Sequence, residues 1–177
     1  MHIELLRDAS RDFPALDAPS EVTSLRVWHC KYRTLADLAR MPNVEGLVVA
    51  TYPDTTLEPL RHLRSLRYLS LLHIPKVSAL DPLAELVSVQ VLSISTLPSW
   101  DASGRVTEVE SLRPLAKLPQ MRHLELFGVR PPDQSLRDLE ACPSLETLRV
   151  SKYPDPEVER FRRVSAATND PAPEPWF

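Results

Sequence analysis

Residues 57–71 read LEPLRHLRSLRYLSL, and this stretch combines two different spacings of leucine. The leucines of its first half, LEPLRHL, recur at every third position, which is the apolar stripe of a short helix with about three residues per turn. Its last two leucines, Leu69 and Leu71, are separated by one residue, so both side chains lie on one face of a strand. The stretch therefore predicts a short helix followed by a strand.

The same pair of patterns recurs along most of the chain. The strand pattern, apolar-x-x-apolar-x-apolar, begins at positions that are 22, 22, 23, 32 and 24 residues apart. Its six copies are Val22/Leu25/Val27, Val44/Leu47/Val49, Leu66/Leu69/Leu71, Val89/Leu92/Ile94, Met121/Leu124/Leu126 and Leu145/Leu148/Val150. Each copy is followed by a helix pattern, most weakly at the end, where it reads Val158/Phe161/Val164. Such units bury their apolar faces only when they stack, so the repeats predict a solenoid with a parallel sheet.

These repeats resemble the leucine-rich repeat family, in its short 22-residue subclass of internalin-like and phosphatase-regulator-like proteins. The resemblance implies an α/β solenoid of about six repeats, with a curved parallel β-sheet on the concave side and short α or 3₁₀ helices on the convex side. One column departs from the family, which usually carries asparagine three positions after the last strand leucine. That column here reads Cys30, Tyr52, Ile74, Leu97, Val129 and Tyr153. We therefore expect an apolar inner column and turns shaped by the prolines that often follow it.

The repeats divide the chain into three parts. We expect an N-terminal cap over residues 1–21, a leucine-rich repeat solenoid over residues 22–164, and a proline-rich C-terminal tail or cap over residues 165–177. The fourth repeat carries a longer connection, an insertion loop over residues 96–111 that includes Trp100. This loop is either a tolerated surface loop or a binding loop, because insertions in repeats often map to the binding face.

Composition excludes several classes of protein. The 177 residues suffice for about one domain, and the 3 glycines, against about twelve at an average usage of roughly 7%, exclude a protein built on glycine-rich phosphate loops. A net charge of −3 argues against a nucleic-acid surface, and no apolar run reaches the roughly 18 residues of a membrane helix. The first twelve residues mix both charges, so we expect neither a secretory signal nor a membrane partner, and a cytoplasmic location.

No catalytic motif survives inspection. The sequence contains no G-x-S-x-G, H-E-x-x-H, C-x-x-C or Walker-type pattern, and His29 and His73 are two repeats apart, about 10 Å, which is too far to share one metal ion. We therefore expect no enzyme, no metal and no cofactor. The carboxylates Asp54, Asp133 and Asp155 each precede a helix pattern by three residues, and we expect them to cap those helices.

The outward positions of the strands carry the remaining information about function. Residues that flank the buried strand leucines point away from the core, and in this family partners usually dock on that face. Several of these positions are aromatic, apolar or charged, which is the composition of interface hot spots. The candidate partner-binding residues, with the insertion-loop tryptophan, are Arg26, Trp28, Tyr68, Leu72, Trp100, His123, Glu125, Phe127 and Arg149.

These residues predict a non-enzymatic module that binds another protein, as an adaptor, a regulator or a toxin-neutralising immunity protein. The alternative is a self-assembling structural subunit that uses the solenoid face or end, and we expect a monomer or a weak homodimer. Segments of the chain's own termini could also cover the outward side chains. The least favoured alternative is an enzyme with a degenerate site on the 96–111 loop.

Overall fold

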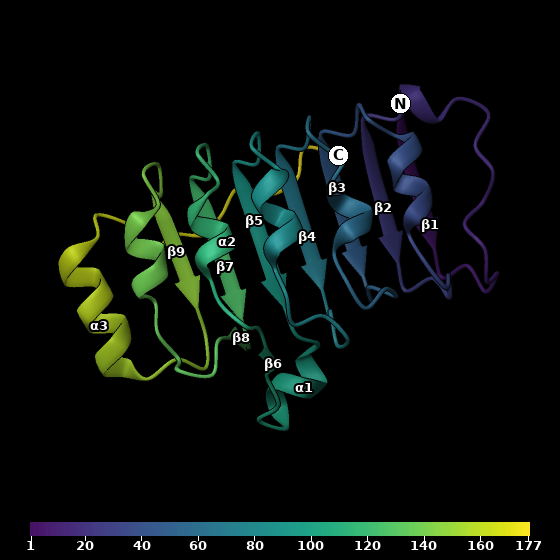
Figure 1. Ribbon diagram of the computed structural model, residues 1–177. Coiled ribbons are helices and arrows are strands. Elements are labelled where there is room, and N and C mark those ends of the chain that lie inside the picture. Colours follow the sequence, from purple (N-terminus) through teal and green to yellow (C-terminus); the bar gives the residue numbers. More distant parts are fainter.

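The computed structural model describes all 177 residues and contains one sheet of seven parallel strands in chain order. Each strand pairs with the next along the solenoid, so the sheet grows in one direction from the N-terminus to the C-terminal repeat (Figure 1). The strands are β1 (His2–Leu6), β2 (Ser24–Trp28), β3 (Gly46–Ala50), β4 (Tyr68–Leu72), β5 (Val91–Ser95), β7 (His123–Phe127) and β9 (Thr147–Val150).

Short helices connect the strands and cover one face of the sheet (Figure 1). Most are short 3₁₀ helices of three to five residues, as the three-residue spacing of their leucines predicts. They span Pro19–Glu21, Ala36–Arg40, Glu58–Leu60, Asp81–Glu85 and Arg137–Ala141, with the α-helices α1 (Pro98–Ala102), α2 (Arg113–Ala116) and α3 (Asp155–Val164). None of the helices is both long and apolar enough to cross a membrane.

The strands pair in the register that the repeat spacing predicts. Leu25 pairs with Leu47, Leu47 with Leu69, and Leu69 with Leu92, and the same column continues through β7 to β9. These leucines belong to one cluster of 38 buried residues that runs the length of the molecule between sheet and helices. A parallel sheet with helices on one face confirms the α/β solenoid.

The N-terminal segment contributes a strand that the leucine pattern does not reveal. Within residues 1–21, the expected cap, His2–Leu6 pair with β2 in full register, with Ile3 opposite Leu25 and Leu5 opposite Val27. Ile3 and Leu5 are only half-buried, since β1 has a neighbour on one side alone. The end of the solenoid is therefore an edge strand, supplemented by Phe13 and Leu16, which pack on the core.

The turn after each strand uses a residue in the left-handed region. Its φ is positive in six of the seven repeats, and the exception is Thr96, where the insertion begins. The six residues are Arg7, His29, Thr51, His73, Gly128 and Lys152. The inner column follows directly, and Tyr52, Ile74 and Val129 in it are at most 1% exposed. The expected apolar column is thus present, but the turn is shaped by the left-handed residue before it as well as by proline.

The prediction that Asp54, Asp133 and Asp155 cap the helices that follow them is wrong. Asp54 accepts hydrogen bonds from Thr34 Oγ1 at 2.6 Å and from Leu35 N at 2.9 Å, so it serves the helix of the preceding repeat. Asp133 accepts from Ser135 N inside its own loop, and Asp155 makes no capping bond to α3. Stacking explains the difference, because the loop that leaves one strand lies beside the helix start of the previous repeat.

The insertion loop contains two short elements of secondary structure. It forms α1 and the two-residue strand β6 (Thr107–Glu108), which pairs with β8 (Val129–Arg130) from the next repeat. Figure 1 shows this unit projecting from the sheet at the C-terminal ends of the strands.

Candidate functional site

The concave face, meaning the face of the sheet opposite the helices, presents three columns of outward side chains. The first column lies at the N-terminal ends of the strands and includes Gly46, Tyr68 and His123; the second lies in the middle; the third lies at the C-terminal ends. The second column includes Arg26, Glu125 and Arg149, and the third includes Trp28, Leu72 and Phe127. The candidate strand residues therefore do share one face.

The C-terminal tail crosses the first column from β9 back towards β1. Thr168 pairs with Thr147 beyond β9, where its N–H donates to Glu146 O at 2.8 Å and its carbonyl accepts from Leu148 N at 2.9 Å. Further along, Ala172 N donates to Glu125 Oε1 at 3.4 Å, and the Phe177 ring reaches Gly46 and His2. Figure 1 shows the yellow segment passing behind the sheet, on the side away from the helices, and ending beside β3.

The tail buries a second apolar cluster on this face. Val48, Tyr68 and Val91 are at most 8% exposed although they point away from the main core, and Trp28, Ala172 and Phe177 pack against them. Tyr68 meets both terminal aromatics edge-on, with ring centroids 6.1 Å from Trp176 and 6.2 Å from Phe177. Burial under the tail raises the pKa of Tyr68 to about 12, so its hydroxyl stays protonated in the physiological range.

Arg26 lies at the end of the covered region. Its Nη1 is 3.2 Å from Glu4 Oε1, and its Nη2 donates to the main-chain oxygen of Phe177 at 3.4 Å. Its Nε is buried and has no hydrogen-bond partner. The tail therefore leaves one donor of this arginine unused.

A charged network occupies the other end of the face, over β5, β7 and β9. Glu125 accepts from Arg149 Nη1 at 3.2 Å and from Ser93 Oγ at 3.2 Å. Arg149 also lies over the ring of Phe127, 5.3 Å from its centroid, while a hydrogen bond of 3.0 Å joins His123 to Thr147. Burial lowers the pKa of His123, which favours the neutral ring at pH 7.

The tail thus divides the candidate residues into two groups. Tyr68, Arg26 and Glu125 contact the tail, whereas Leu72 and Phe127 in the third column remain partly exposed. Trp28 belongs to both groups, because it packs on the covered cluster and stays partly accessible. The third column is the part of the concave face that is open to a partner.

Trp100 lies apart from the strand residues, on α1 of the insertion. Its ring stands edge-on against His73, with centroids 4.7 Å apart, and Arg105 lies 5.9 Å above it. Burial and the neighbouring His29 lower the pKa of His73, whose Nδ1 is buried without a partner. Trp100 is half-buried, and its ring contacts His73, the residue that directly follows β4.

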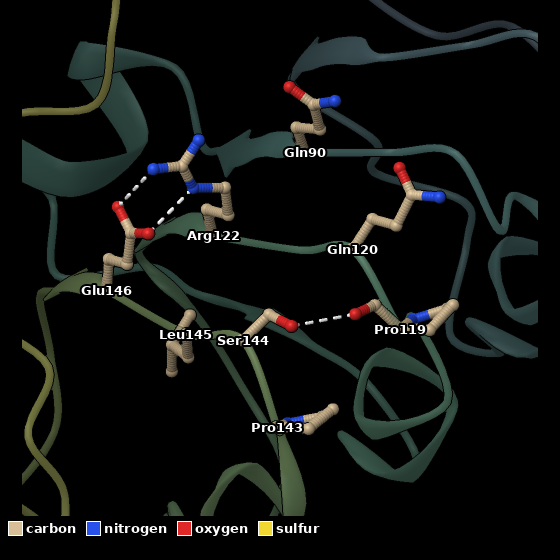
Figure 2. Close-up of a pocket in the computed structure, with 8 residues that line it drawn as sticks. All are labelled: Gln90, Pro119, Gln120, Arg122, Pro143, Ser144, Leu145 and Glu146. Atoms are coloured by element: carbon tan, nitrogen blue, oxygen red, sulfur yellow. Dashed lines mark hydrogen bonds and ion pairs between the residues drawn. The ribbon is translucent and has the colours of Figure 1, made fainter.

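A surface pocket of about 530 Å³ lies at the loops that enter β5, β7 and β9 (Figure 2). Arg122 and Glu146 pair directly on one side of it, with Nε donating to Oε1 at 2.7 Å and Nη2 to Oε2 at 3.0 Å. Ser144 Oγ donates to Pro119 O at 2.8 Å. These contacts join adjacent repeats and neutralise the arginine, so the pocket offers no free cation for an anionic ligand. No cluster of three metal-binding side chains is present in the molecule.

Sequence reasoning missed the residues that receive the tail. By strand alternation Gly46, Val48 and Val91 are ordinary outward positions, but in the structure they form the floor under Phe177 and Ala172. Two signals were available: Gly46 is the one glycine inside a strand, and the chain's terminal pair, Trp176 and Phe177, is aromatic. The spacing of these residues in the sequence does not indicate that they contact one another. The contact is evident only in the folded chain.

Solved structures share this architecture. An internalin C2 from Listeria monocytogenes str. 4b F2365 superposes with a TM-score of 0.50 at 17% identity, over 84% of this chain and 70% of that chain. A chain of the mouse RP105/MD-1 complex superposes with a TM-score of 0.50 at 15% identity, over 94% of this chain but only 37% of that chain. No model of a known family matches the sequence, and no curated protein matches it significantly. The register of the strands and these structural neighbours together show that the chain has the leucine-rich repeat fold.

Proposed function

We propose that this chain is a non-enzymatic module that binds another protein through the open part of its concave face. The observation that carries the proposal is the third column, where Trp28, Leu72 and Phe127 remain partly exposed and Leu72 and Phe127 lie outside both apolar clusters. Their aromatic and apolar surface lies beside Arg149, and aromatic residues with arginine are enriched where interfaces concentrate binding energy. An adaptor, a regulator or a toxin-neutralising immunity protein would each use such a face.

Affinity capture with paired variants tests this assignment. Leu72→Asp and Phe127→Asp place a charge in the third column, and each should abolish capture of the partner that the unaltered chain retains. Val87→Asp is the matched control, because Val87 is exposed and lies outside the strands. All three variants should keep a melting temperature close to that of the parent. Capture that survives Leu72→Asp and Phe127→Asp together would refute the proposed face.

Self-assembly is the second candidate, and β1 is the feature that favours it. This edge strand has one paired neighbour, and Leu6 at its end is 55% exposed. Open strand edges pair readily with other chains. Sedimentation across a concentration series separates the candidates: a chain that stays monomeric at high concentration argues against assembly, whereas a dimer that Leu6→Glu dissociates supports it.

A further inference from the structure

The covered half of the concave face has the features of a binding site for an extended peptide. We infer that it binds a segment of another protein in which prolines precede an aromatic residue, and that the chain's own tail occupies the site as a built-in competitor. This inference rests on the proposed function, since it names the chemistry of one partner segment. It concerns the parts of the first and second columns that the tail covers, and not the open third column.

The site is shaped for an aromatic ring. A Cβ atom built at Gly46 would lie 2.1 Å from Phe177 Cε1, so the ring rests directly on the backbone of β3. The rings of His2 and Tyr68 flank it, with centroids 5.4 and 6.2 Å from that of Phe177. Glycine weakens a strand and is expected there only where something approaches closely. We call this arrangement around Gly46 the aromatic socket.

The tail has the composition of a peptide ligand that stays extended. Pro171, Pro173 and Pro175 alternate with other residues between Asp170 and Trp176. Proline favours an extended backbone with little conformational entropy to lose, and without N–H groups it cannot add to the sheet as a strand. The tail therefore contacts the face through its aromatic side chains and a few isolated main-chain groups, as an extended peptide from another protein would.

The contacts that hold the tail are few. Beyond Thr168 it makes two hydrogen bonds to the sheet, Ala172 N to Glu125 and Arg26 to Phe177 O, both at 3.4 Å. Trp176 is still 58% exposed, although Arg67 lies 5.9 Å over its ring. Because Arg26 Nε remains unpaired, a segment that offered this group an acceptor would gain a charge-assisted hydrogen bond that the tail lacks. The occupant seen here is thus one that a better ligand can replace.

Tethering sets the strength of the competition. A short tethered segment acts at an effective concentration of ~mM. With an intrinsic Kd of about 0.1 mM, the docked tail would be favoured about tenfold over the open form, and a competing peptide would lose about tenfold in apparent affinity. Releasing the tail should therefore raise the apparent affinity for the competing peptide about tenfold.

The test uses a fluorescently labelled peptide with the sequence of residues 169–177 and the full-length chain. The Trp176→Ala/Phe177→Ala variant, whose own tail is weakened, should bind the peptide about tenfold more tightly than the parent chain. Adding Gly46→Leu to this variant fills the socket and should abolish binding, while Gly46→Ala should weaken it less. Both substitutions suit a strand at least as well as glycine, and circular dichroism checks that the fold persists. A peptide with alanine in place of its last residue is the matched control and should not bind.

Three results would overturn the inference. They are no binding to the tail-weakened variant, binding that ignores Gly46→Leu, and equal binding to the parent and tail-weakened chains. A parent chain that dimerises and becomes monomeric with Trp176→Ala/Phe177→Ala would instead assign the socket to the tail of a second copy. Leu72→Asp and Phe127→Asp, in the tail-weakened background, should leave peptide binding unchanged. Peptide binding and partner capture can therefore fail independently, and each failure identifies the proposal that is wrong.

Discussion

The residue after each strand is where this chain departs most from what its composition suggests. Left-handed backbone is usually assigned to glycine or asparagine, yet only Gly128 in this column is a glycine, and Thr51, His73 and Lys152 adopt φ values of 65–66°. The structure shows that ordinary residues also take the strained positions, held by sheet bonds such as Thr51 N to Leu72 O at 2.7 Å.

Thr51 is the clearest case of this strain, because a β-branched side chain at positive φ is a conformational outlier. Thr51→Gly should raise the free energy of unfolding by about 0.5–1 kcal/mol. Removing the strained conformation should stabilise the fold by about 1–2 kcal/mol. The greater flexibility of glycine in the unfolded chain offsets about 0.5–1 kcal/mol of this gain. Urea denaturation monitored by circular dichroism measures the change. Thr55→Gly is the control, since Thr55 is exposed in the same loop and its φ is not positive; it should lower stability by up to about 1 kcal/mol. If both variants lose stability equally, strain at Thr51 is not the dominant effect.

Neighbouring elements are joined by side chains that cap one another's helices across repeats. In four repeats a hydroxyl accepts a hydrogen bond from the backbone N–H two residues further on, at the start of the local helix, as Ser111 Oγ does from Arg113 N at 2.9 Å. In two of these repeats a carboxylate from the following repeat adds a second bond. Asp54 does so for Leu35 N, and Glu157 accepts from Leu136 N at 2.7 Å. Glu157 lies on α3, so this contact couples the last helix to the repeat before it.

The coupling through Glu157 should depend on pH. Hydrogen bonds from Arg160 lower the pKa of Glu157 to about 2, with a further contribution from Leu136 N. A carboxyl whose pKa is lowered on folding stabilises the fold fully above its unfolded pKa, and loses that contribution as the pH falls through its folded pKa. Glu157→Gln should therefore lower the free energy of unfolding by about 1–3 kcal/mol at pH 7, the range for a hydrogen bond to a charged group. The difference from the parent should shrink between about pH 4.5 and pH 2.

Guanidinium denaturation at several pH values measures this difference. Glu159→Gln is the matched control, because Glu159 is exposed on the same helix and takes part in no ion pair. It should change stability by less than about 0.5 kcal/mol at any pH. A Glu157→Gln effect that is constant down to pH 2 would show that its cause is packing and not charge.

At the scale of the whole molecule, the sequence predicted the strand register to the residue, because a period of about 22 brings the leucines of one repeat, such as Leu47 and Leu69, beside one another. It also placed the outward columns correctly, since alternate strand residues point to opposite faces. It did not predict which part of that face is open. The tail has no periodicity, and its docking depends on the fit of Phe177 to Gly46, which lie 131 positions apart and share no pattern.

The tail also changes how the solenoid holds together. In a repeat protein each unit contacts only its neighbours, and stability propagates along one dimension. Here residues 168–177 run from β9 to β3 and bring Phe177 against His2 in β1 and Arg26 in β2. This segment therefore ties the last repeat to the first three, which are otherwise connected only through the strands between them.

Hydrogen exchange measured by mass spectrometry tests this tie. In Phe177→Ser the amides of β1, β2 and β3 should exchange about fivefold faster. The reason is that losing a half-buried aromatic contact lowers the free energy of local opening at that end of the solenoid by about 1 kcal/mol. The amides of β5 and β7 should be unaffected, because their leucines are held by the main core. Val87→Ser is the control, since Val87 is exposed and lies outside the strands, and it should leave all five strands as in the parent. Exchange in β1–β3 that is the same in Phe177→Ser and in the parent would mean that the tail rests on the face without stabilising it, and that the first repeats depend on their neighbours alone.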